Sequence, residues 1–507
     1  MSMDGYGKLF QPTIIQYKIL VDLFESLGFT VCADVAVDDW AQDEREDAAY
    51  RLQALAYHGY DDIAVSRLYP FQQRGSSFIR NGGSVILADA PGLGKTASTI
   101  CALNEQAKYL ILCPKSLISW WVHEIGQWQR QDIPIIPLTA PFKEHELDTL
   151  ECGWVVTNWE SVRNKTMFGD IHWSAVVGDE SQKIKSKKTL LFKAVKALST
   201  DRFIFLTGTP MSKDPSDLWT MLNIIQPSVF TSFWRFREWF CEYNPHDPYS
   251  KVTGIRNNST LQTLLSLYML RRTIDEVGID LPPKTVQEIP VEMPPQQRKA
   301  YKDMATKLII ELESGENIEA WTPLALLTRL RQLASTTATL DKTDYSGKLD
   351  YVMDEVATGE KLVVFTTFRN TVTALSQRLE AKGIKHVLLM GGTPSNVTGE
   401  IVSKFQTDPS VQVLIGTVQT GGVGLTLTAS SRVIFVDRHY NPTVQEQAED
   451  RVYRIGQKNH VHILIPYHKG TVDEQVKAIL EHKLGLTHAV LKPELEAHLM
   501  KVARWKT

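Results

Sequence analysis

Short apolar runs recur along the chain in two groups. The first group holds VILA, YLILC, WVVT, AVVG and FIFLT, which begin at residues 85, 109, 154, 175 and 203. The second holds KLVVF, HVLLM, VQVLIG, RVIFVD and VHILI, which begin at residues 361, 386, 411, 432 and 461. The runs are continuous rather than alternating, as in strands buried on both faces of a parallel sheet, and helix-like stretches separate them. The pattern therefore predicts two α/β lobes.

Between the two groups, from residue 211 to about residue 345, the pattern lapses. This stretch is rich in aromatic and helix-forming residues and contains the breaks LPPK at residue 281 and MPPQ at residue 293. Such breaks suit a linker between helical elements. Residues 1–65 carry helical periodicity and the acidic stretch DDWAQDERED. We interpret them as an accessory region.

Composition narrows the class of protein. A chain of 507 residues is too long for one hydrophobic core, and its 43% hydrophobic and 22% charged residues are ordinary for a soluble protein. No apolar stretch has the length of a membrane span, the start lacks a secretory signal, and the five cysteines form no CxxC pair. We therefore expect a cytoplasmic protein without structural zinc. The net charge of -3 argues against bulk coating of nucleic acid but leaves a local basic groove open.

The stretch ILADAPGLGKTAST at residues 86–99 matches a phosphate-binding loop (P-loop), with Asp89 at the first glycine position. Gly92 and Gly94 let backbone N–H groups approach phosphate oxygens, Lys95 reaches the β- and γ-phosphates, and the Thr96 hydroxyl can bind Mg²⁺. A structural turn is the alternative. The predicted nucleotide-binding residues of the loop are Asp89, Gly92, Leu93, Gly94, Lys95 and Thr96.

A carboxylate pair follows the AVVG run. Asp179 would hold the Mg²⁺ shell, and Glu180 would orient or deprotonate the attacking water, as a Walker B site requires. A solvated acidic turn is the alternative. Ligands are expected at the carboxyl edge of an α/β sheet, and the two signals together favour an ATP site there.

Phosphoryl transfer also needs cationic charge on the leaving phosphate. In QAEDRVYRIGQ, at residues 447–457, Arg451 and Arg454 are three positions apart and share a face if the stretch is helical. A solvated or salt-bridged helix face is the alternative.

The order of these signatures resembles the SWI/SNF-like ATPases of helicase superfamily two. The likeness covers residues 68–480, and the GGSVILAD and LTGTPMSKDPSDLW segments look most like the fork-remodelling, strand-annealing branch. The signatures are, in order, LYPFQ, DAPGLGKT, CPKSLISWW, TNWE, DESQKIK, LTGTP, MLRR, SGKLD, TGGVGLTLTAS and QAEDRVYRIGQ.

The resemblance implies an α/β fold of two RecA-like lobes, each a parallel sheet flanked by helices, with helical protrusions inserted and ATP and Mg²⁺ between the lobes. It implies that Gln72 reads adenine, that Gly422 and Gln447 also bind the nucleotide, and that Arg451 and Arg454 act as arginine fingers. In the family, Thr207, Gly208 and Thr209 couple nucleotide state to the grip on DNA.

The resemblance also implies the domain boundaries. Residues 66–285 form lobe 1 with a protrusion at about 211–275, residues 286–345 a helical protrusion or linker, residues 346–470 lobe 2, and residues 471–507 helices that brace the lobes.

Two departures from the family pattern stand out. Gln182 occupies a position where many relatives have His, which would alter coupling more than hydrolysis because the amide still donates a hydrogen bond. Gln419 stands where an Arg or Lys is common, which puts one phosphate contact in doubt.

Duplex tracking needs phosphate contacts that ignore sequence, supplied by amides, hydroxyls and lysines at loop ends. Taken alone, the cluster KIKSKK at residues 183–188 is typical of a solvated surface, but its place just behind the Walker B carboxylates favours DNA contact. The aromatic segment FWRFREWF at residues 233–240 fits core packing better than base stacking. By resemblance the DNA path is lined by Lys115, Ser116, Thr157, Asn158, Lys183, Lys185, Thr366, Thr367, Thr420 and Gly421.

Three functions are weighed. The first is a double-stranded-DNA-dependent ATPase that steps along duplex or forked DNA as a monomer, with a possible protein partner at residues 1–65 and no membrane. The second is a strand-separating helicase on DNA or RNA. The third is a nucleotide-binding scaffold without turnover, which the intact Lys95, Asp179 and Arg451 disfavour. A bacterial or viral-host cytoplasm is expected, or a nucleus if the source is eukaryotic.

Overall fold

The structure, a computed structural model, describes most of the chain between residues 66 and 481. Within this described part, no helix is both long and apolar enough to cross a membrane. The described ranges are 66–103, 105–129, 132–139, 147, 150–164, 166–184, 186–211, 215–243, 252–279, 281–314, 323–340, 343–393, 395–421, 425–440 and 442–481.

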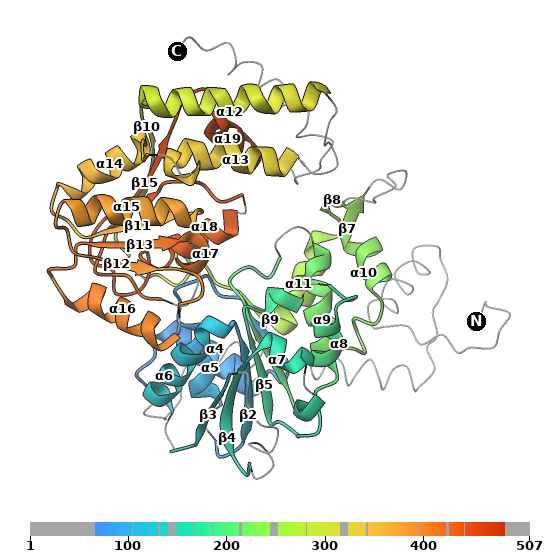
Figure 1. Cartoon of the computed structure of the whole chain (residues 1–507). Helices are drawn as coiled ribbons and strands as arrows, with labels where there is room; N and C mark the ends of the chain where they lie inside the picture. Colours follow the sequence, from blue (N-terminus) through green and yellow to red (C-terminus); the bar gives the residue numbers. More distant parts are fainter. Residues whose placement is uncertain are drawn as a thin grey trace, which may run out of the picture. The chain divides into compact units, whose positions relative to one another are not determined.

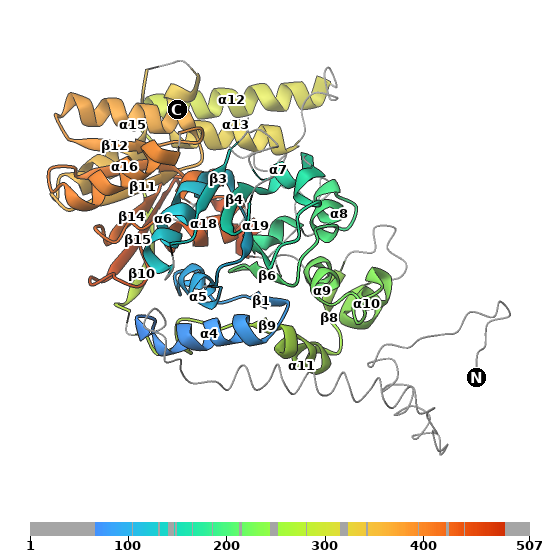
Figure 2. The same ribbon diagram turned by 90° about the horizontal axis from the view of Figure 1, so that it is seen from below.

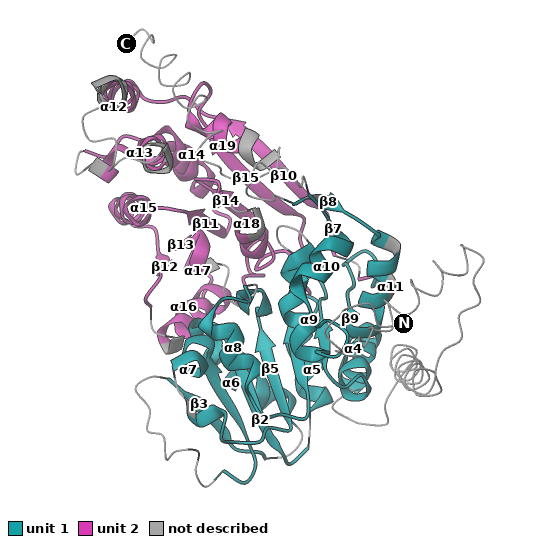
Figure 3. Ribbon diagram, turned by 90° about the vertical axis from the view of Figure 1, so that its right-hand side faces the viewer, with its two compact units in different colours: residues 1–278 teal, residues 279–507 magenta. Residues whose placement is uncertain are grey.

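The chain divides into two compact units, residues 1–278 (unit 1) and residues 279–507 (unit 2), shown in two colours in Figure 3. The division falls shortly before residue 286, where the sequence placed the end of lobe 1. Each unit contains its own parallel sheet with helices on both faces, so the predicted fold class is confirmed.

Unit 1 is built on a seven-stranded parallel sheet (Figure 1). All five predicted runs are strands, and their residues are almost entirely buried, as the continuous apolar pattern requires. The strand order is β3 (Ile135–Leu138), β4 (Gly153–Asn158), β2 (Lys108–Cys113), β5 (Ala175–Asp179), β6 (Phe203–Leu206), β1 (Val85–Leu87) and β9 (Met269–Leu270).

Two groups of helices cover the faces of this sheet, as the view from below shows (Figure 2). One group holds α4 (Pro70–Asn81), α5 (Lys95–Ala102) and α6 (Ile118–Trp128), and the other holds α7 (Trp159–Asn164), α8 (Leu190–Lys196) and α9 (Trp219–Ile225). The grouping follows from strand order, because right-handed crossovers that run in opposite directions along a sheet place their helices on opposite faces.

The segment predicted as a purely helical protrusion also contains strands. It holds α10 (Phe233–Phe240), the antiparallel pair β7 (Cys241–Tyr243) and β8 (Val252–Ile255), α11 (Asn258–Tyr268) and then β9. Phe236 and Phe240 of α10 are buried in the core of unit 1, whereas Trp234 is 63% exposed. The FWRFREWF segment is therefore mainly core packing, as predicted.

Unit 2 is built on a six-stranded sheet whose pairs are all parallel. The five predicted runs are strands here as well, but an additional strand, β10, lies at one edge. The strand order is β10 (Lys284–Pro290), β15 (Val461–Tyr467), β14 (Arg432–Phe435), β11 (Leu362–Thr366), β13 (Val413–Thr417) and β12 (His386–Leu389).

Strand β10 begins just before residues 286–345, which were predicted to form a helical protrusion or linker, and runs into them. It pairs with β15 along its whole length. Its sequence, KTVQEIP, gives no apolar run because an edge strand is covered less than a central one, and none of its residues is buried. The helices α12 (Pro295–Ser314) and α13 (Pro323–Ser335) follow it.

The remaining helices of unit 2 pack against the two faces of the sheet. Residues of α14 (Gly347–Val356) and α15 (Arg369–Ala381) belong to one buried cluster, and residues of α16 (Ser395–Thr407), α17 (Val418–Gly421) and α18 (Pro442–Glu449) belong to another. The two clusters are the separate cores on either side of the sheet.

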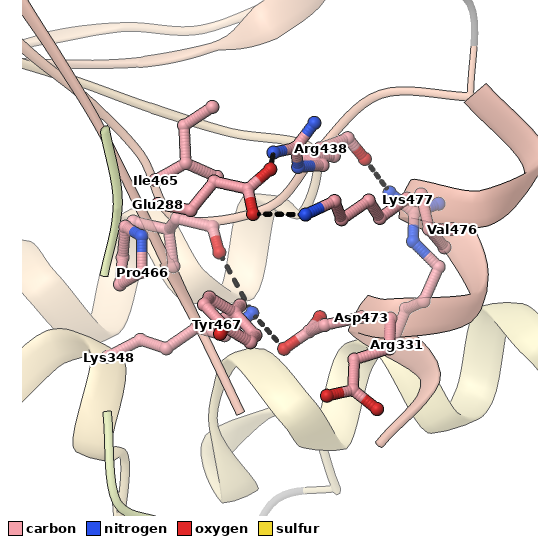
Figure 4. Close-up of a pocket in the computed structure, with 12 residues that line it drawn as sticks. Glu288, Arg331, Lys348, Arg438, Ile465, Pro466, Tyr467, Asp473, Val476 and Lys477 are labelled. Atoms are coloured by element: carbon pink, nitrogen blue, oxygen red, sulfur yellow. Dashed lines mark hydrogen bonds and ion pairs between the residues drawn. The ribbon is translucent and has the colours of Figure 1, made fainter. Parts of the chain in front are cut away.

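A charged cluster anchors the last described helix, α19 (Val472–Glu481), inside unit 2 (Figure 4). The ammonium group of Lys348, which is 1% exposed, lies 2.8 Å from the Asp473 carboxylate. The carboxylate of Glu288 binds both Arg438 and, at 2.6 Å, Lys477. Ion pairs from α14 and β10 therefore fix α19; the predicted bracing of both lobes stays a prediction.

Candidate nucleotide-binding site

Four neighbouring parallel strands of unit 1 end at one edge of the sheet and carry the predicted motifs. In the order β5, β6, β1 and β9, these strands lead into the Asp179 carboxylate, Thr207, the loop that begins at Asp89, and Arg272. Because parallel strands share one carboxyl edge, residues from four distant parts of the chain converge there.

The loop after β1 has the backbone conformation of a phosphate cradle. Gly92 and Gly94 have φ of 83° and 78°, in the left-handed region that suits glycine. Gly94 is the N-cap of α5, and within the described residues no side chain caps this helix. Since the N–H groups of a first helical turn have no intrahelical acceptor, this end of α5 suits an anion.

Lys95, the first residue of α5, turns its side chain back over the loop. Its ammonium group donates to the carbonyl oxygens of Asp89 at 2.7 Å and Ala90 at 3.3 Å. The charge therefore lies above the loop, where phosphate oxygens would replace the carbonyl oxygens as acceptors. The hydroxyl-bearing Thr96 follows and is 8% exposed.

Gln72 lies directly against the P-loop. Its amide donates to the Leu93 carbonyl at 3.0 Å and accepts from the Tyr69 N–H at 3.0 Å. A Cβ on Gly94 would come within 2.2 Å of the Gln72 amide nitrogen, so only glycine fits there. The predicted adenine-reading residue and the phosphate loop thus form one packed surface, although they are far apart in α4 and α5.

Asp179, the last residue of β5, is held by three hydrogen bonds. Its carboxylate accepts from the Trp121 indole at 2.9 Å and from the Glu180 N–H at 2.9 Å, and its backbone carbonyl accepts from the Trp159 indole at 2.9 Å. In the sequence, Trp121 and Trp159 were identified only as members of the CPKSLISWW and TNWE signatures. The position of a tryptophan in the sequence does not indicate which acceptor its indole N–H will bind.

The electrostatics of Asp179 are those of a buried anion next to another anion. Burial, and then the negative charge of Glu180, raise its pKa to about 6, while the Trp121 hydrogen bond and the charge of Lys95 oppose the increase. A bound cation would offset this cost. Glu180 itself has φ of 51°, an unusual conformation for a non-glycine residue, which turns its side chain abruptly after the strand.

A hydrogen-bonded relay joins this carboxylate pair to the LTGTP motif. The Gln182 amide donates to the Glu180 carboxylate at 2.5 Å and accepts from the Thr207 hydroxyl at 2.8 Å. The Thr207 hydroxyl in turn accepts from the Thr209 N–H at 3.0 Å. The departure from the usual His at position 182 therefore lies in the middle of the relay.

The same motif also touches the P-loop. A Cβ on Gly208 would come within 2.8 Å of the Pro91 ring, which shows how closely the two segments pack. The segment Thr207, Gly208 and Thr209, predicted to couple nucleotide state to DNA grip, therefore packs on the phosphate loop and is connected to Glu180 through Gln182.

Asp89, predicted to bind the nucleotide as part of the P-loop, has a carboxylate that binds elsewhere in unit 1. Asp89 is 1% exposed, and its carboxylate does not face the phosphate cradle but pairs with Arg272 through two bonds, of 2.9 Å and 2.5 Å. Only the Asp89 carbonyl, which accepts from Lys95, belongs to the loop's inner surface. The MLRR motif that carries Arg272 had no assigned role.

The residues at this edge fit a magnesium nucleotide. The Thr96 hydroxyl and the Asp179 carboxylate are oxygen donors of the kind that Mg²⁺ prefers. Lys95 and the glycine-bearing loop supply the phosphate contacts. Within the described residues, no cluster of three or more His, Cys, Asp or Glu suggests another metal site.

In unit 2, Arg451 and Arg454 do not lie on one helical face. Helix α18 ends at Glu449, and the chain continues in turns in which the Arg451 N–H donates to Ala448 and the Gln457 N–H donates to Arg454. The Arg454 guanidinium donates to the Leu425 carbonyl at 3.0 Å. Gln447 lies in α18, and Gly422 lies outside the described residues.

The predicted DNA contacts separate into exposed and internal groups. Lys115 and Ser116 begin the exposed short helix η1 (Lys115–Leu117), and the Lys183 ammonium lies 3.3 Å from Glu160 on a half-exposed surface. These three remain candidates. Lys185 lies outside the described residues.

Three of the residues predicted to contact DNA have side chains that bind inside the protein, and their contact with DNA stays a prediction. Thr157 is fully buried and donates to Leu138, Asn158 accepts from Ser161, and Thr366 donates to Asp437. Position at a strand end did not distinguish an inward side chain from an outward one.

The remaining DNA candidates lie in unit 2. Thr420 donates to the carbonyls of Leu389 and Thr417, and Gly421 ends α17. The hydroxyl oxygen of Thr367 is buried without a hydrogen-bond partner within the described residues, and its contact with DNA stays a prediction.

The fold and the site define a P-loop nucleotide-binding protein with two parallel-sheet units, whose carboxylate pair follows a buried strand. Comparison with known families is consistent with this class and narrows it. Residues 56–338 match the SNF2-related domain, and residues 347–456 match the helicase conserved C-terminal domain. The chain belongs to the SNF2-related family and is a SWI/SNF-like ATPase of helicase superfamily two, as the motif order indicated.

Known relatives span bacteria, archaea and eukaryotes. The chain is 28% identical over 465 residues to the human SWI/SNF-related matrix-associated actin-dependent regulator of chromatin subfamily A member 1, with 84% of this chain and 44% of that protein covered. It is 27% identical over 456 residues to an uncharacterized ATP-dependent helicase of Mycoplasma genitalium, with 85% and 43% covered. The chain thus spans less than half the length of these relatives.

Among solved structures, the Sulfolobus solfataricus SWI2/SNF2 ATPase core in complex with double-stranded DNA is similar to this chain. The identity is 27%, the TM-score is 0.41, and the match covers 86% of this chain and 95% of the other. The placement in the fork-remodelling branch stays a prediction.

Proposed function

We propose that this protein is a double-stranded-DNA-dependent ATPase that translocates along duplex DNA and thereby remodels DNA or protein–DNA complexes. The observation that carries the proposal is the relay from Glu180 through Gln182 to Thr207, because it connects the hydrolytic carboxylate to a segment that also packs on the P-loop. A site built only to bind nucleotide has no need of such a connection.

Each residue of the site has a defined task in this proposal. The Lys95 ammonium leaves the loop carbonyls for the phosphates, and the Asp179 carboxylate and Thr96 hydroxyl hold Mg²⁺, which neutralises phosphate charge. Glu180 orients the attacking water and accepts its proton. Arg451 and Arg454 of unit 2 remain our proposed source of cationic charge on the leaving phosphate.

A nucleic-acid substrate is supported by the family and by the surface of unit 1. The human relative is named as a regulator of chromatin. Lys115, Ser116 and Lys183 supply the cationic and hydroxyl groups that bind phosphates without reading sequence. Neither a strand-separating activity nor a natural substrate is specified by these contacts.

The test is ATP turnover by the full chain with no nucleic acid, duplex DNA, single-stranded DNA, forked DNA and RNA. We expect duplex or forked DNA to stimulate turnover far more than RNA, and a triplex-displacement assay to detect movement along the duplex. Unwinding of a partial duplex would instead favour the helicase alternative. No turnover with any nucleic acid would refute the proposal.

Two variants test whether ATP turnover depends on this site. Glu180→Gln should reduce turnover by about 100-fold or more while ATP still binds, because only the proton acceptor is lost. Lys95→Ala should reduce both turnover and ATP affinity. Parental activity in either variant would show that the role given to that residue is wrong.

A further inference from the structure

The Arg272 side chain forms three hydrogen bonds at the nucleotide edge of unit 1, yet no predicted role involves it. It lies just beyond β9, and its guanidinium binds the Asp89 carboxylate in a two-bond fork of 2.9 Å and 2.5 Å. The two side chains are 13% and 2% exposed, so the pair is shielded from water. A fork of this kind is stronger and more directional than a single ion pair.

The same guanidinium also reaches the other side of the site. It donates to the backbone carbonyl of Phe71, the residue before Gln72, and its carbon lies 5.5 Å from the centre of the Phe71 ring. A Cβ on Gly75, one helical turn further along α4, would come within 3.0 Å of it. Arg272 is therefore packed between the P-loop and the start of the helix that carries Gln72.

The backbone of the segment that carries Arg272 also binds the P-loop. The Ala88 N–H donates to the Leu270 carbonyl at 2.7 Å, and the Ala90 N–H donates to the Arg272 carbonyl at 2.8 Å. These two bonds extend the β1–β9 pairing into the first residues of the P-loop. The loop is thus held through both backbone and side chain by a segment about 180 residues further along the chain.

We propose that Arg272 is a positioning residue for ATP, which fixes the P-loop and Gln72 relative to one another and thereby sets ATP affinity and base selectivity. This inference rests on the proposed function, since it gives Gln72 and the loop a common nucleotide. Asp89 is the partner through which Arg272 acts on the loop, and the Phe71 carbonyl is the partner through which it acts on Gln72.

The variants are Arg272→Gln, Arg272→Lys and Asp89→Asn, with Arg271→Gln as a matched control. Arg271 precedes Arg272 in the same motif but is exposed. Lysine keeps the positive charge but cannot form the two-bond contact with the Asp89 carboxylate. Arg272→Lys therefore distinguishes the effect of the charge from the effect of the guanidinium geometry. Thermal melting of each variant shows whether the fold is retained, and Arg272→Lys keeps the test possible if Arg272→Gln does not fold.

The measurements are ATP and GTP binding by equilibrium titration without DNA, followed by KM and kcat for both nucleotides with duplex DNA. We expect Arg272→Gln to raise the KM for ATP about tenfold while kcat changes less than about threefold, and to narrow the preference for ATP over GTP. Arg272→Lys and Asp89→Asn should lie between this variant and the parent, and Arg271→Gln should match the parent.

Two results would overturn the inference. One is an unchanged KM for ATP in Arg272→Gln; the other is an equal loss of ATP and GTP affinity together with kcat, which a general structural role would produce. The test of Arg272 and the test of the proposed function can fail independently of one another. If the parent binds ATP but DNA does not stimulate it, the proposed function fails while the binding titrations still decide the role of Arg272.

Discussion

Replacement of Gln182 by alanine tests the relay between the Walker B carboxylate and the LTGTP motif. The change removes the donor that binds Glu180 at 2.5 Å and the acceptor that binds Thr207 at 2.8 Å. A hydrogen bond to a charged group contributes about 1.5–3 kcal/mol and a neutral one about 1 kcal/mol. Glu180 would then keep its strained backbone, with φ of 51°, without the side-chain bond that orients its carboxylate.

The expected effect is mainly on kcat. If about 2 kcal/mol of this interaction holds Glu180 in position during hydrolysis, kcat falls about 30-fold. The KM for ATP should change little, because Gln72 and Lys95 keep their own contacts. Thr207→Val removes the bond to Gln182 and the bond from the Thr209 N–H but keeps the bond between Gln182 and Glu180, so it should lower the stimulation by DNA more than the basal rate.

The assay is steady-state ATP turnover with and without saturating duplex DNA. Gln182→His should restore most of the activity, since an imidazole offers one donor and one acceptor. Gln127→Ala, which removes an exposed glutamine from α6 of the same unit, is the control. A kcat for Gln182→Ala within about threefold of the parent, or an equal loss in Gln127→Ala, would refute the relay.

Two further predictions concern buried charges. Asp179 has a pKa of about 6 in the folded protein against 3.8 ordinarily, so the group favours folding below pH 3.8 and loses this contribution as the pH rises through 6. Asp179→Asn should therefore stabilise the nucleotide-free protein by about 2 kcal/mol at pH 8 and hardly at all near pH 4. Urea denaturation at both pH values measures this difference. Equal stability of variant and parent at pH 8 would contradict the prediction. Lys348→Met should destabilise unit 2 by about 3 kcal/mol in the same assay, because it leaves the Asp473 carboxylate without its partner at 2.8 Å. A loss below about 0.5 kcal/mol would show that Asp473 does not depend on Lys348.

The sequence alone predicted the role of a residue wherever that role follows from the residue's place in a strand or in a contiguous motif. All ten apolar runs are strands because central strands of a parallel sheet must be apolar on both faces. The P-loop glycines were predictable because only glycine suits their backbone angles. Among the strands of the two sheets, the signal failed for β3, β9 and β10. The edge strands β3 and β10 need little apolar surface, and the two-residue strand β9 is too short to show a pattern.

The roles that escaped prediction depend on pairing between distant segments. Asp89 belongs to a familiar loop, but its carboxylate binds Arg272, which lies just beyond β9 and which no local spacing connects to it. Trp121 binds Asp179 across 58 positions of sequence, whereas Thr157 turns inward to Leu138. Side-chain direction at the end of a strand is set by tertiary packing, which a motif does not encode.

Strand β10 has a practical consequence for anyone who divides this protein into fragments. A second-half fragment that begins at residue 346, where the motifs suggest a boundary, would omit β10 and expose the hydrogen-bonding edge of β15, an apolar strand buried along most of its length. Unprotected edges of this kind recruit strands from other molecules, so such a fragment should aggregate. Beginning instead at residue 279 keeps the edge covered by the chain's own residues.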